Sequence, residues 1–481
     1  MAINCFGIGG TNTHLILQPG ERSSESSPAR GENLPVLLPF SGRTEEQVKA
    51  SLTEAASNAR NTEFAYLIRS AFKKTIPGHG YRGCGLLKQG ESEISVMIQK
   101  SQKRPLWIVF PGMGSQYAEM GKDLLQIDVF AESMHRSRET LKSVNIDLDQ
   151  ILEPRNDSIY KNIHHAMMAI TAVQMALWDT FSALKAHADG YIGHSNGEYL
   201  CAYADGCLSA EETLLMAHAR GRAFIDGKMT EGAMASVGAA AEDIKPRLPD
   251  GVELACDNAP NNVTISGRES SVKSFVEQLK KEGKFAAIVN SCGIAAHGSF
   301  IVKSAELFLQ YSGNIITDER PRSSKWLSTC LPKGEWNSTL GKNASPEYFA
   351  HNLRAPVQFR NALQQIPQDS IVIELSPKGF FQAIIKESVP NNCVLLAPMS
   401  FKATDKLAHF FESVGQAFTA GVDIQMDKLY PQVQTPVSAQ TPSIAHLVKW
   451  DHQDSYKTHI LEYPLVSFLN LTKFEVMAAV A

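Results

Sequence analysis

The sequence predicts an α/β protein with a parallel-sheet core, an inserted smaller subdomain and a small α/β unit ahead of the core. Two observations carry this prediction. A buried strand, a glycine-rich turn and a helix follow one another twice, from residue 105 and again from 190, as in parallel sheets covered by helices. Between 233 and 295 the order changes to strand, helix, strand, strand, helix, strand, which indicates a separate subdomain.

The first hundred residues divide into a short end piece and a small unit. Residues 1–19 hold a glycine-rich turn and an apolar, strand-like run. The polar stretch at 21–35 indicates a linker, because Ser, Glu, Pro and Gly bury little apolar area. Within 20–103 we expect a small α/β unit. Its predicted elements are a strand at 36–42, helices at 45–59 and 65–74, and a strand at 81–87.

The core is expected over 104–425. The strand PLWIVF leads into the turn PGMGSQ and then into a helix whose first turn holds Gln116 and Glu119. The strand YIG leads through a turn with Ser195 into the helix EYLCAYA, and the alternation resumes with IVIELSPKGFFQAII and CVLLAPMS. The insert, at about 233–295, has the element order of a ferredoxin-like unit.

The C-terminal part has a different composition. Residues 426–455 are rich in Pro, Gln, Ser and Thr, which predicts an extended surface segment, and 456–481 fit no expected domain. The arginine-containing run EETLLMAHARGRAF, earlier in the core, predicts a helix with Arg220 and Arg222. An arginine that faces inward needs a partner such as a carboxylate, whereas one that faces outward is simply solvated.

Charge and cysteine content exclude several classes of protein. The net charge is −4, which gives no basic stripe for nucleic acid and no polybasic segment for a membrane surface. The eight cysteines form no C-x-x-C pair and no zinc-like spacing, so we expect buried free thiols in a reducing compartment and no metal. No apolar run of about 18 residues and no signal-like start are present, which favours the cytoplasm.

The strongest chemical motif is GHSNG at 193–197. It fits G-x-S-x-G, a sharp strand-to-helix turn that exposes a serine hydroxyl at the end of a sheet. Ser195 is therefore a candidate nucleophile, with a purely structural turn as the alternative. A serine needs a base, and the sequence holds 14 histidines. His194 points away on such a turn and is expected to pack; His297, after the last strand of the insert, is one candidate.

The other glycine-rich turn, PGMGSQ, lacks the G-K-[ST] ending of a phosphate loop. It can instead supply a backbone N–H that converges with that of Asn196 on a developing oxyanion. A plain tight turn explains the pattern equally well.

Six segments resemble one family. PLWIVFPGMGSQ, YIGHSNGEYLCAYADGCLS, MAHARGRAF, NNVTISG, AAHGSF and NLRAPVQF occur in the order found in malonyl/acetyl acyltransferase domains. The P-G-M-G turn, YADGCLS and HLVKWDH are most similar to the animal type of multifunctional fatty acid synthase. The resemblance covers about residues 1–455 and implies a hydrolase-like core with a ferredoxin-like insert.

The resemblance assigns roles to individual residues. It implies Ser195 as nucleophile, His297 as base, and Arg220 as the clamp for a malonyl carboxylate. It implies that the backbone N–H groups of Met113 and Asn196 form the oxyanion hole.

Three further positions follow from the same resemblance. Asn352, in NLRAPVQF, marks the place where the family orients the histidine through a backbone carbonyl, so a dyad is expected and not a triad. Ala296 and Met167 stand where animal members carry aromatic residues, which predicts a wider acyl pocket that tolerates methylmalonyl. The resemblance also divides the chain. It gives a ketosynthase tail (1–19), a linker subdomain (20–103), the acyltransferase (104–425), a following linker (426–455) and an unassigned tail (456–481).

The implied reaction is a ping-pong transfer. Malonyl or acetyl moves from CoA to Ser195 and then to the phosphopantetheine of acyl carrier protein, without a permanently bound cofactor. The expected partners are acyl carrier protein, CoA thioesters and the ketosynthase of a parent synthase, with no nucleic acid and no membrane. The parent is expected to be a homodimer and this chain a monomer.

Three alternatives stay open. An α/β serine hydrolase or thioesterase uses the same elbow, with Asp451 and His452 as the late acid and histidine. A polyketide synthase acyltransferase that accepts methylmalonyl fits the altered pocket residues. A non-catalytic docking scaffold is the third.

Overall fold

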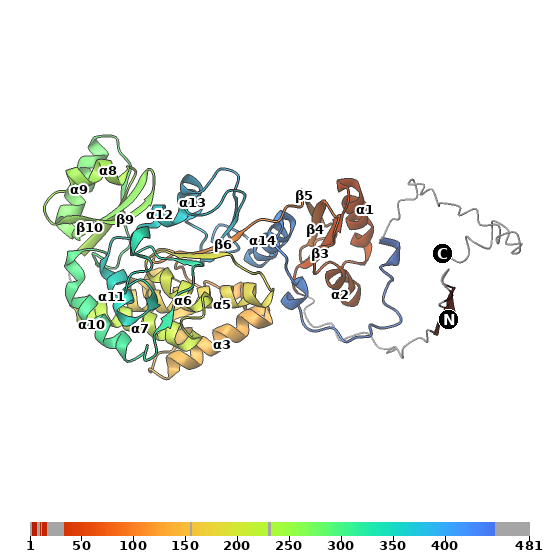
Figure 1. Cartoon of the computed structure of the whole chain (residues 1–481). Coiled ribbons are helices and arrows are strands. Elements are labelled where there is room, and N and C mark those ends of the chain that lie inside the picture. The colour runs from red at the N-terminus through yellow and green to blue at the C-terminus, as the bar shows by residue number, and fades with distance from the viewer. Residues whose placement is uncertain are drawn as a thin grey trace, which may run out of the picture.

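The computed structural model describes residues 2–6, 10, 12–16, 33–153, 156–228 and 232–447 (Figure 1). They form a large α/β core with an insert at one end and a small α/β unit at the other (Figure 1). In the described part of the chain, every helix is too short or too polar to cross a lipid bilayer.

The core is a five-stranded sheet in the order β13-β7-β6-β15-β16, with parallel neighbours throughout. The strands are β6 (Leu106–Phe110), β7 (Gly190–Gly193), β13 (Trp326–Leu327), β15 (Ile371–Glu374) and β16 (Val394–Leu396). β6 and β15 are buried along their whole length, as expected for parallel strands with both faces covered. The predicted α/β class with a parallel-sheet core is confirmed.

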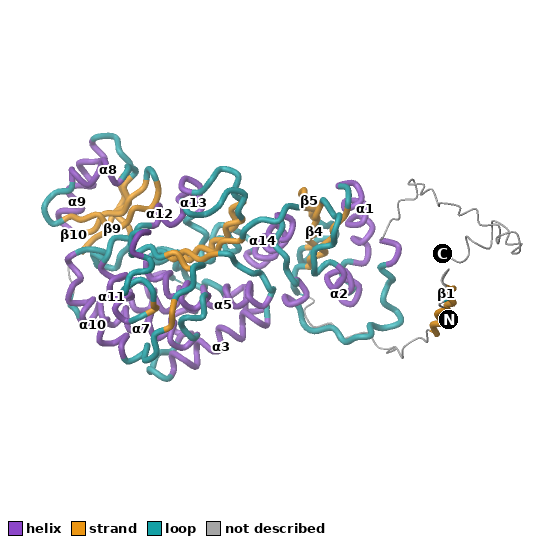
Figure 2. The backbone as a smooth tube through the Cα atoms, viewed as in Figure 1, coloured by secondary structure: helices purple, strands orange, loops and turns teal. Residues whose placement is uncertain are grey.

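Helices cover both faces of this sheet (Figure 2). The helices that cover one face of the sheet pack on one another. They are α3 (Asp128–Lys142), α5 (Ile163–Ala183), α6 (Glu198–Ala204), α7 (Ala210–Asp226), α10 (Val302–Gly313) and α11 (Pro346–Arg354). On the other face lie α12 (Phe359–Leu363) and α13 (Gln382–Ser388). α5 is apolar on nearly all sides and is the central buried helix.

The helix expected to begin at Gln116 is absent. Residues 111–121 form irregular turns, and Glu119 has a left-handed backbone with φ of 59°. Helical structure begins only with a 3₁₀ turn at Lys122–Gln126 and α3. The physical reason is local, since a left-handed residue interrupts a right-handed helix.

The insert has the predicted ferredoxin-like topology. Its sheet has the order β11-β8-β10-β9 and is antiparallel at every pair. Its elements are β8 (Gly232–Val237), α8 (Ala241–Ile244), β9 (Val252–Ala259), β10 (Asn262–Arg268), α9 (Glu269–Lys281) and β11 (Ala286–Val289). The two helices cover one face (Figure 1), and their apolar residues share a separate cluster with this sheet.

The small unit contains the antiparallel sheet β3-β4-β5 and two helices. Its elements are β3 (Val36–Gly42), α1 (Glu45–Ala55), α2 (Thr62–Ala71), β4 (Tyr81–Leu87) and β5 (Ser95–Lys100). The sequence did not predict β5. The core helix α14 (Lys406–Ala420) packs on β4 and β5 and joins the unit to the core (Figure 1).

The segment after the core packs on the small unit. The Tyr430 hydroxyl accepts from Leu37 N and donates to Pro35 O, both at 2.8 Å. Leu447 is buried in the apolar cluster of the small unit, and its carbonyl accepts from Ser51 Oγ. Between the 3₁₀ turns Met426–Leu429 and Ala445–Leu447 the segment has no helix or strand, but several of its side chains are buried anchors and not surface residues. Residues 448–481, which include Asp451, His452 and the tail 456–481, lie outside the described residues.

Two smaller expectations, a strand near the N-terminus and buried free cysteines, are met in part. At the N-terminus, β1 (Ala2–Phe6) and β2 (Asn12–Ile16) pair as an antiparallel hairpin with exposed side chains. All eight cysteines are free thiols, as expected, but they are not all buried. Cys5 is exposed, and Cys292 and Cys393 are partly exposed.

Candidate active site

The elbow around Ser195 is built by two glycines with no room for a side chain. A Cβ on Gly193 would lie 2.4 Å from Glu198 N, and one on Gly197 would lie 1.9 Å from Phe110 O. The chain therefore turns tightly between β7 and α6, and Ser195 is held in the left-handed region with φ of 57°. The strand–turn–helix context that the motif requires is present.

His297 meets the serine. Its Nε2 lies 2.7 Å from Ser195 Oγ, and its Nδ1 lies 2.9 Å from Ala355 O. A carbonyl only accepts, so Nδ1 carries the proton and Nε2 is free to accept the serine proton. The structure thus places at the elbow the histidine that the sequence offered as one candidate among fourteen.

The pKa of His297 is lowered to about 3. Burial is the main cause, and the charges of Arg220 and His194 add to it, while the carbonyls of Ala355 and Asn352 act in the opposite direction. The imidazole is therefore neutral at physiological pH, the form that can take a proton.

Asn352 lies in the segment whose backbone carbonyls face His297. His297 Nδ1 donates to the carbonyl of Ala355, three residues later, and the Asn352 carbonyl raises the pKa of His297 less than that of Ala355 does. The Asn352 amide instead joins two other groups: Oδ1 accepts from Arg220 Nη1 at 2.7 Å, and Nδ2 donates to Ser195 O at 3.2 Å. A backbone carbonyl of this segment does face the histidine, and the orienting role of Asn352 itself stays a prediction.

Arg220 is the inward-facing arginine of α7. It is 1% exposed, and its Nη2 lies 3.1 Å from Ser195 Oγ. Within the described residues no carboxylate lies within ion-pair distance of it. Arg222, two residues later, is exposed and pairs with Asp226 at 3.4 Å. Of the two alternatives, Arg220 thus fits the inward-facing one and Arg222 the solvated one.

The first glycine-rich turn packs directly on the elbow. A Cβ on Gly112 would lie 2.7 Å from His194 O and 3.3 Å from Ser195 Cβ, so only glycine allows this approach. The turn thus contacts Ser195 at the residue before Met113. That the N–H groups of Met113 and Asn196 bind the oxyanion stays a prediction. The Asn196 side chain is fully buried, and neither of its amide atoms has a partner among the described residues.

The two proposed pocket residues both belong to the main core. Met167 is on the buried face of α5, and Ala296 precedes the base directly and is half-buried. Both, like Met113, belong to or pack against the main apolar cluster. Their role in an acyl pocket stays a prediction.

His194 has the packing role expected of it. Its ring lies edge-on between those of Phe359 and Phe381, at centroid distances of 5.1 and 5.0 Å. Its Nε2 lies 2.9 Å from Asn258 Oδ1 on β9, which ties the elbow to the insert.

A buried network that the residue pattern did not predict lies behind the elbow. Glu198 Oε1 accepts from the N–H and the hydroxyl of Thr329, both at 2.6 Å, and Tyr348 donates to Oε2. The Thr329 hydroxyl also lies 2.7 Å from Gly193 O. Burial raises the pKa of Glu198, while Arg322 nearby lowers it. The available signal was an acidic residue in an otherwise apolar stretch immediately after the elbow.

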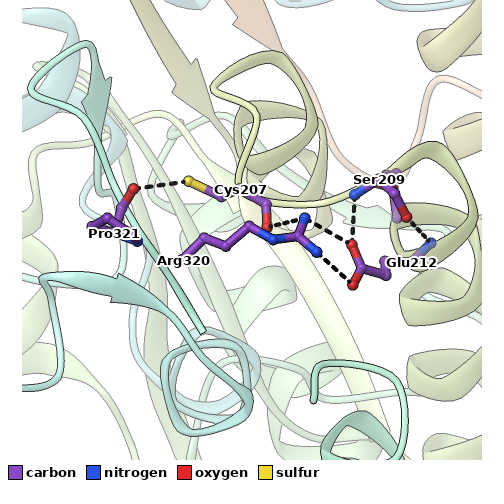
Figure 3. Close-up of polar contacts among 6 residues, drawn as sticks. Cys207, Ser209, Glu212, Arg320 and Pro321 are labelled. Atoms are coloured by element: carbon purple, nitrogen blue, oxygen red, sulfur yellow. Dashed lines mark hydrogen bonds and ion pairs between the residues drawn. The ribbon is translucent and has the colours of Figure 1, made fainter. Parts of the chain in front are cut away.

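The helix that carries Arg220 has a firmly fixed start. Ser209 and Glu212 form a reciprocal capping box at the first turn of α7. Arg320 binds both Glu212 oxygens at 3.1 Å and also donates to Cys207 O (Figure 3). These contacts tie α7 to the neighbouring edge of the core and fix the position of its arginine.

Among the described residues, no group of three or more His, Cys, Asp or Glu side chains is placed to hold a metal ion.

Two family models match the chain. The model described as "Acyl transferase domain" matches residues 107–424, and that described as "Ketoacyl-synthetase C-terminal extension" matches residues 1–86. A highly reducing polyketide synthase from Aspergillus fumigatus is 27% identical over 483 residues, which is 95% of this chain and 18% of that protein. The chain spans about a fifth of the length of the curated relatives it matches.

Solved structures with the same fold are acyltransferase domains of synthases. The domain from module 8 of the salinomycin polyketide synthase has a TM-score of 0.67 at 21% identity and covers 82% of this chain and 98% of its own. The domain of SpnD, solved with 2-(pent-4-yn-1-yl)malonyl, has a TM-score of 0.66 at 20% identity and covers 83% and 98%. The curated relatives are polyketide synthases. The likeness to the animal fatty acid synthase therefore stays a prediction.

Proposed function

The chain belongs to the acyl transferase domain family, and on this basis we propose that it transfers malonyl-type groups from CoA to a carrier phosphopantetheine through an acyl-Ser195 intermediate. The observation that carries the proposal is the convergence of three groups from distant parts of the chain. Ser195 Oγ lies 2.7 Å from His297 Nε2 and 3.1 Å from Arg220 Nη2. A nucleophile, its base and an unpaired cation suit the transfer of an acyl group that carries its own carboxylate.

The steps follow from this arrangement. Ser195 Oγ attacks the thioester carbonyl while its proton passes to His297 Nε2, and the Ala355 carbonyl stabilises the imidazolium through Nδ1–H. Collapse of the oxyanion breaks the C–S bond, and the imidazolium returns the proton to the departing CoA thiolate. The thiol of the carrier then attacks the acyl-serine by the same path in reverse.

The proposed partners are those of multidomain synthases. They are an acyl carrier protein, which receives the acyl group, and a ketosynthase, which uses it. The match of the ketosynthase extension at residues 1–86 supports this context. The features shared with animal fatty acid synthases and the similarity to polyketide synthases fit one proposal, since both kinds of synthase load malonyl-type units.

The test is covalent labelling. The chain is incubated with labelled malonyl-CoA, the adduct is mapped by mass spectrometry, and carrier protein is then added. We expect one adduct, on Ser195, that moves to the carrier faster than to water, and no adduct on Ser195→Ala. An adduct on another residue would refute the proposed nucleophile. Release to water alone would favour the hydrolase alternative.

We further propose that the acyl pocket accepts methylmalonyl. Ala296 and Met167 stand where larger aromatic residues are expected from the family resemblance, and the SpnD domain holds a substituted malonyl group. In a competition between malonyl-CoA and methylmalonyl-CoA, we expect kcat/KM values within about 10-fold, since one methyl group changes binding by about 10- to 200-fold in a tight pocket. Ala296→Phe is expected to increase the preference for malonyl-CoA over methylmalonyl-CoA. A strict malonyl preference in the unmodified chain would refute the wider pocket.

A further inference from the structure

We propose that Tyr199 and Asn352 are positioning residues that turn one edge of the Arg220 guanidinium toward the acyl group, and that they thereby set the selectivity for acyl groups with a carboxylate. The inference rests on the proposed function. It adds two positioning residues to that function and specifies which edge of the guanidinium binds the carboxylate.

The hydrogen bonds of Arg220 leave only one edge free. A guanidinium has five N–H groups, arranged as an end edge between Nη1 and Nη2 and a side edge between Nε and Nη2. Nη1 donates to Asn352 Oδ1 at 2.7 Å and to Tyr199 Oη at 3.2 Å, which uses both of its hydrogens. Nη2 donates one hydrogen to Ser195 Oγ at 3.1 Å. Because both Nη1 hydrogens are used, the end edge cannot offer two free donors to a carboxylate.

The side edge is buried and unsatisfied. Nε has no hydrogen-bond partner in the described part of the chain, and one N–H of Nη2 remains. The whole side chain is 1% exposed, so bulk water does not satisfy these groups. Two parallel N–H donors match the two oxygens of a carboxylate, which is the strongest pairing available to an arginine. The chemistry of the side edge therefore fits the carboxylate of a malonyl-type group.

Tyr199 is a rigid support for this orientation. It lies on α6, four residues after Ser195, and is fully buried. Its ring packs against that of Phe349, 5.2 Å away. The hydroxyl therefore cannot follow Arg220 if the arginine moves, and it fixes where Nη1 lies.

Asn352 links the arginine to the nucleophile. The same amide that accepts from Arg220 Nη1 donates to Ser195 O at 3.2 Å. The position of the bound carboxylate is thus set relative to the serine.

The test is Tyr199→Phe, with Tyr203→Phe as the matched control. Tyr203 is on the same helix, but its hydroxyl donates to Asp179 and does not contact Arg220. For each variant, kcat/KM is measured with malonyl-CoA and acetyl-CoA. We expect the malonyl-to-acetyl ratio to fall about 10-fold in Tyr199→Phe, mainly through KM for malonyl-CoA, and to be unchanged in Tyr203→Phe. An unchanged ratio in Tyr199→Phe, or an equal fall in both variants, would overturn the proposal.

A second measurement identifies the edge directly. In ¹⁵N-labelled protein, the Nε resonance of Arg220 is assigned by its loss in Arg220→Lys. Acylation of Ser195 with malonyl is expected to shift this resonance, and acylation with acetyl is expected to leave it in place. A malonyl-dependent shift confined to Nη would contradict the side edge while the acyl-enzyme itself still forms. If no acyl-Ser195 forms at all, the proposed function fails and not only this inference.

Discussion

Replacing His297 with alanine is expected to lower the rate of acyl transfer by about 10²- to 10⁴-fold, the contribution typical of a general base. The structure gives His297 the only imidazole contact to Ser195 Oγ among the described residues, at 2.7 Å. Without it the serine proton has no acceptor. The measurement is the single-turnover rate of Ser195 acylation by labelled malonyl-CoA.

The control is another histidine of the core. His351 precedes Asn352 on α11. Its Nε2 lies 3.2 Å from Cys330 O and makes no hydrogen bond to Ser195. His351→Gln is expected to acylate within a few-fold of the unmodified chain, and melting curves confirm that both variants fold. If His297→Ala acylated at a near-normal rate, another residue would have to be the base.

The pH profile tests the same residue. Burial and the nearby Arg220 lower the pKa of His297 to about 3, so its proton-accepting form persists well below the usual histidine range. The kcat/KM for acylation is therefore expected to show no acid limb near pH 6.5 and to fall only at lower pH. A malonyl carboxylate on Arg220 cancels part of the positive charge beside the imidazole and raises its basicity in the complex. A limb near 6.5 in the free enzyme would show that the histidine is less buried.

The sequence predicted the parts of the fold that depend on local patterns. The insert follows from six consecutive elements, and its sheet order β11-β8-β10-β9 is a direct consequence of that topology. The elbow follows from Gly193 and Gly197, because each packs against backbone that leaves no space for a Cβ. The helix expected at Gln116 is wrong because the left-handed backbone of Glu119 does not show in the residue pattern.

Contacts between distant residues could not be predicted in this way. Thr329 and Glu198 are 131 residues apart, and Asn352 and Arg220 are 132 apart. Nothing in the local sequence around either residue indicates its partner. The same holds for Ala355, whose carbonyl orients the base. A carbonyl is present at every position, so only the fold decides which one faces the imidazole.

Replacing Arg220 with alanine is expected to lower kcat/KM for malonyl-CoA by about 100- to 1,000-fold, comparable to breaking a buried charge pair. The loss for acetyl-CoA is expected to be less than about 10-fold, because acetyl has no carboxylate to pair with the guanidinium. The matched control is Arg222→Ala, two residues later on α7. Arg222 is exposed and paired with Asp226, so its removal is expected to change neither value appreciably.

The asymmetry between the two substrates is the informative result. Arg220 contacts Ser195, Tyr199 and Asn352, so its loss disturbs the site for every substrate. Its loss also removes a positive charge that lowers the pKa of His297, which makes the imidazole a stronger base and offsets part of that disturbance. Both effects reach either substrate, although the pKa effect is smaller with malonyl, whose carboxylate already cancels part of the charge of Arg220. The lost carboxylate contact affects malonyl alone. Equal losses for both substrates would therefore show that Arg220 supports the site without binding the carboxylate.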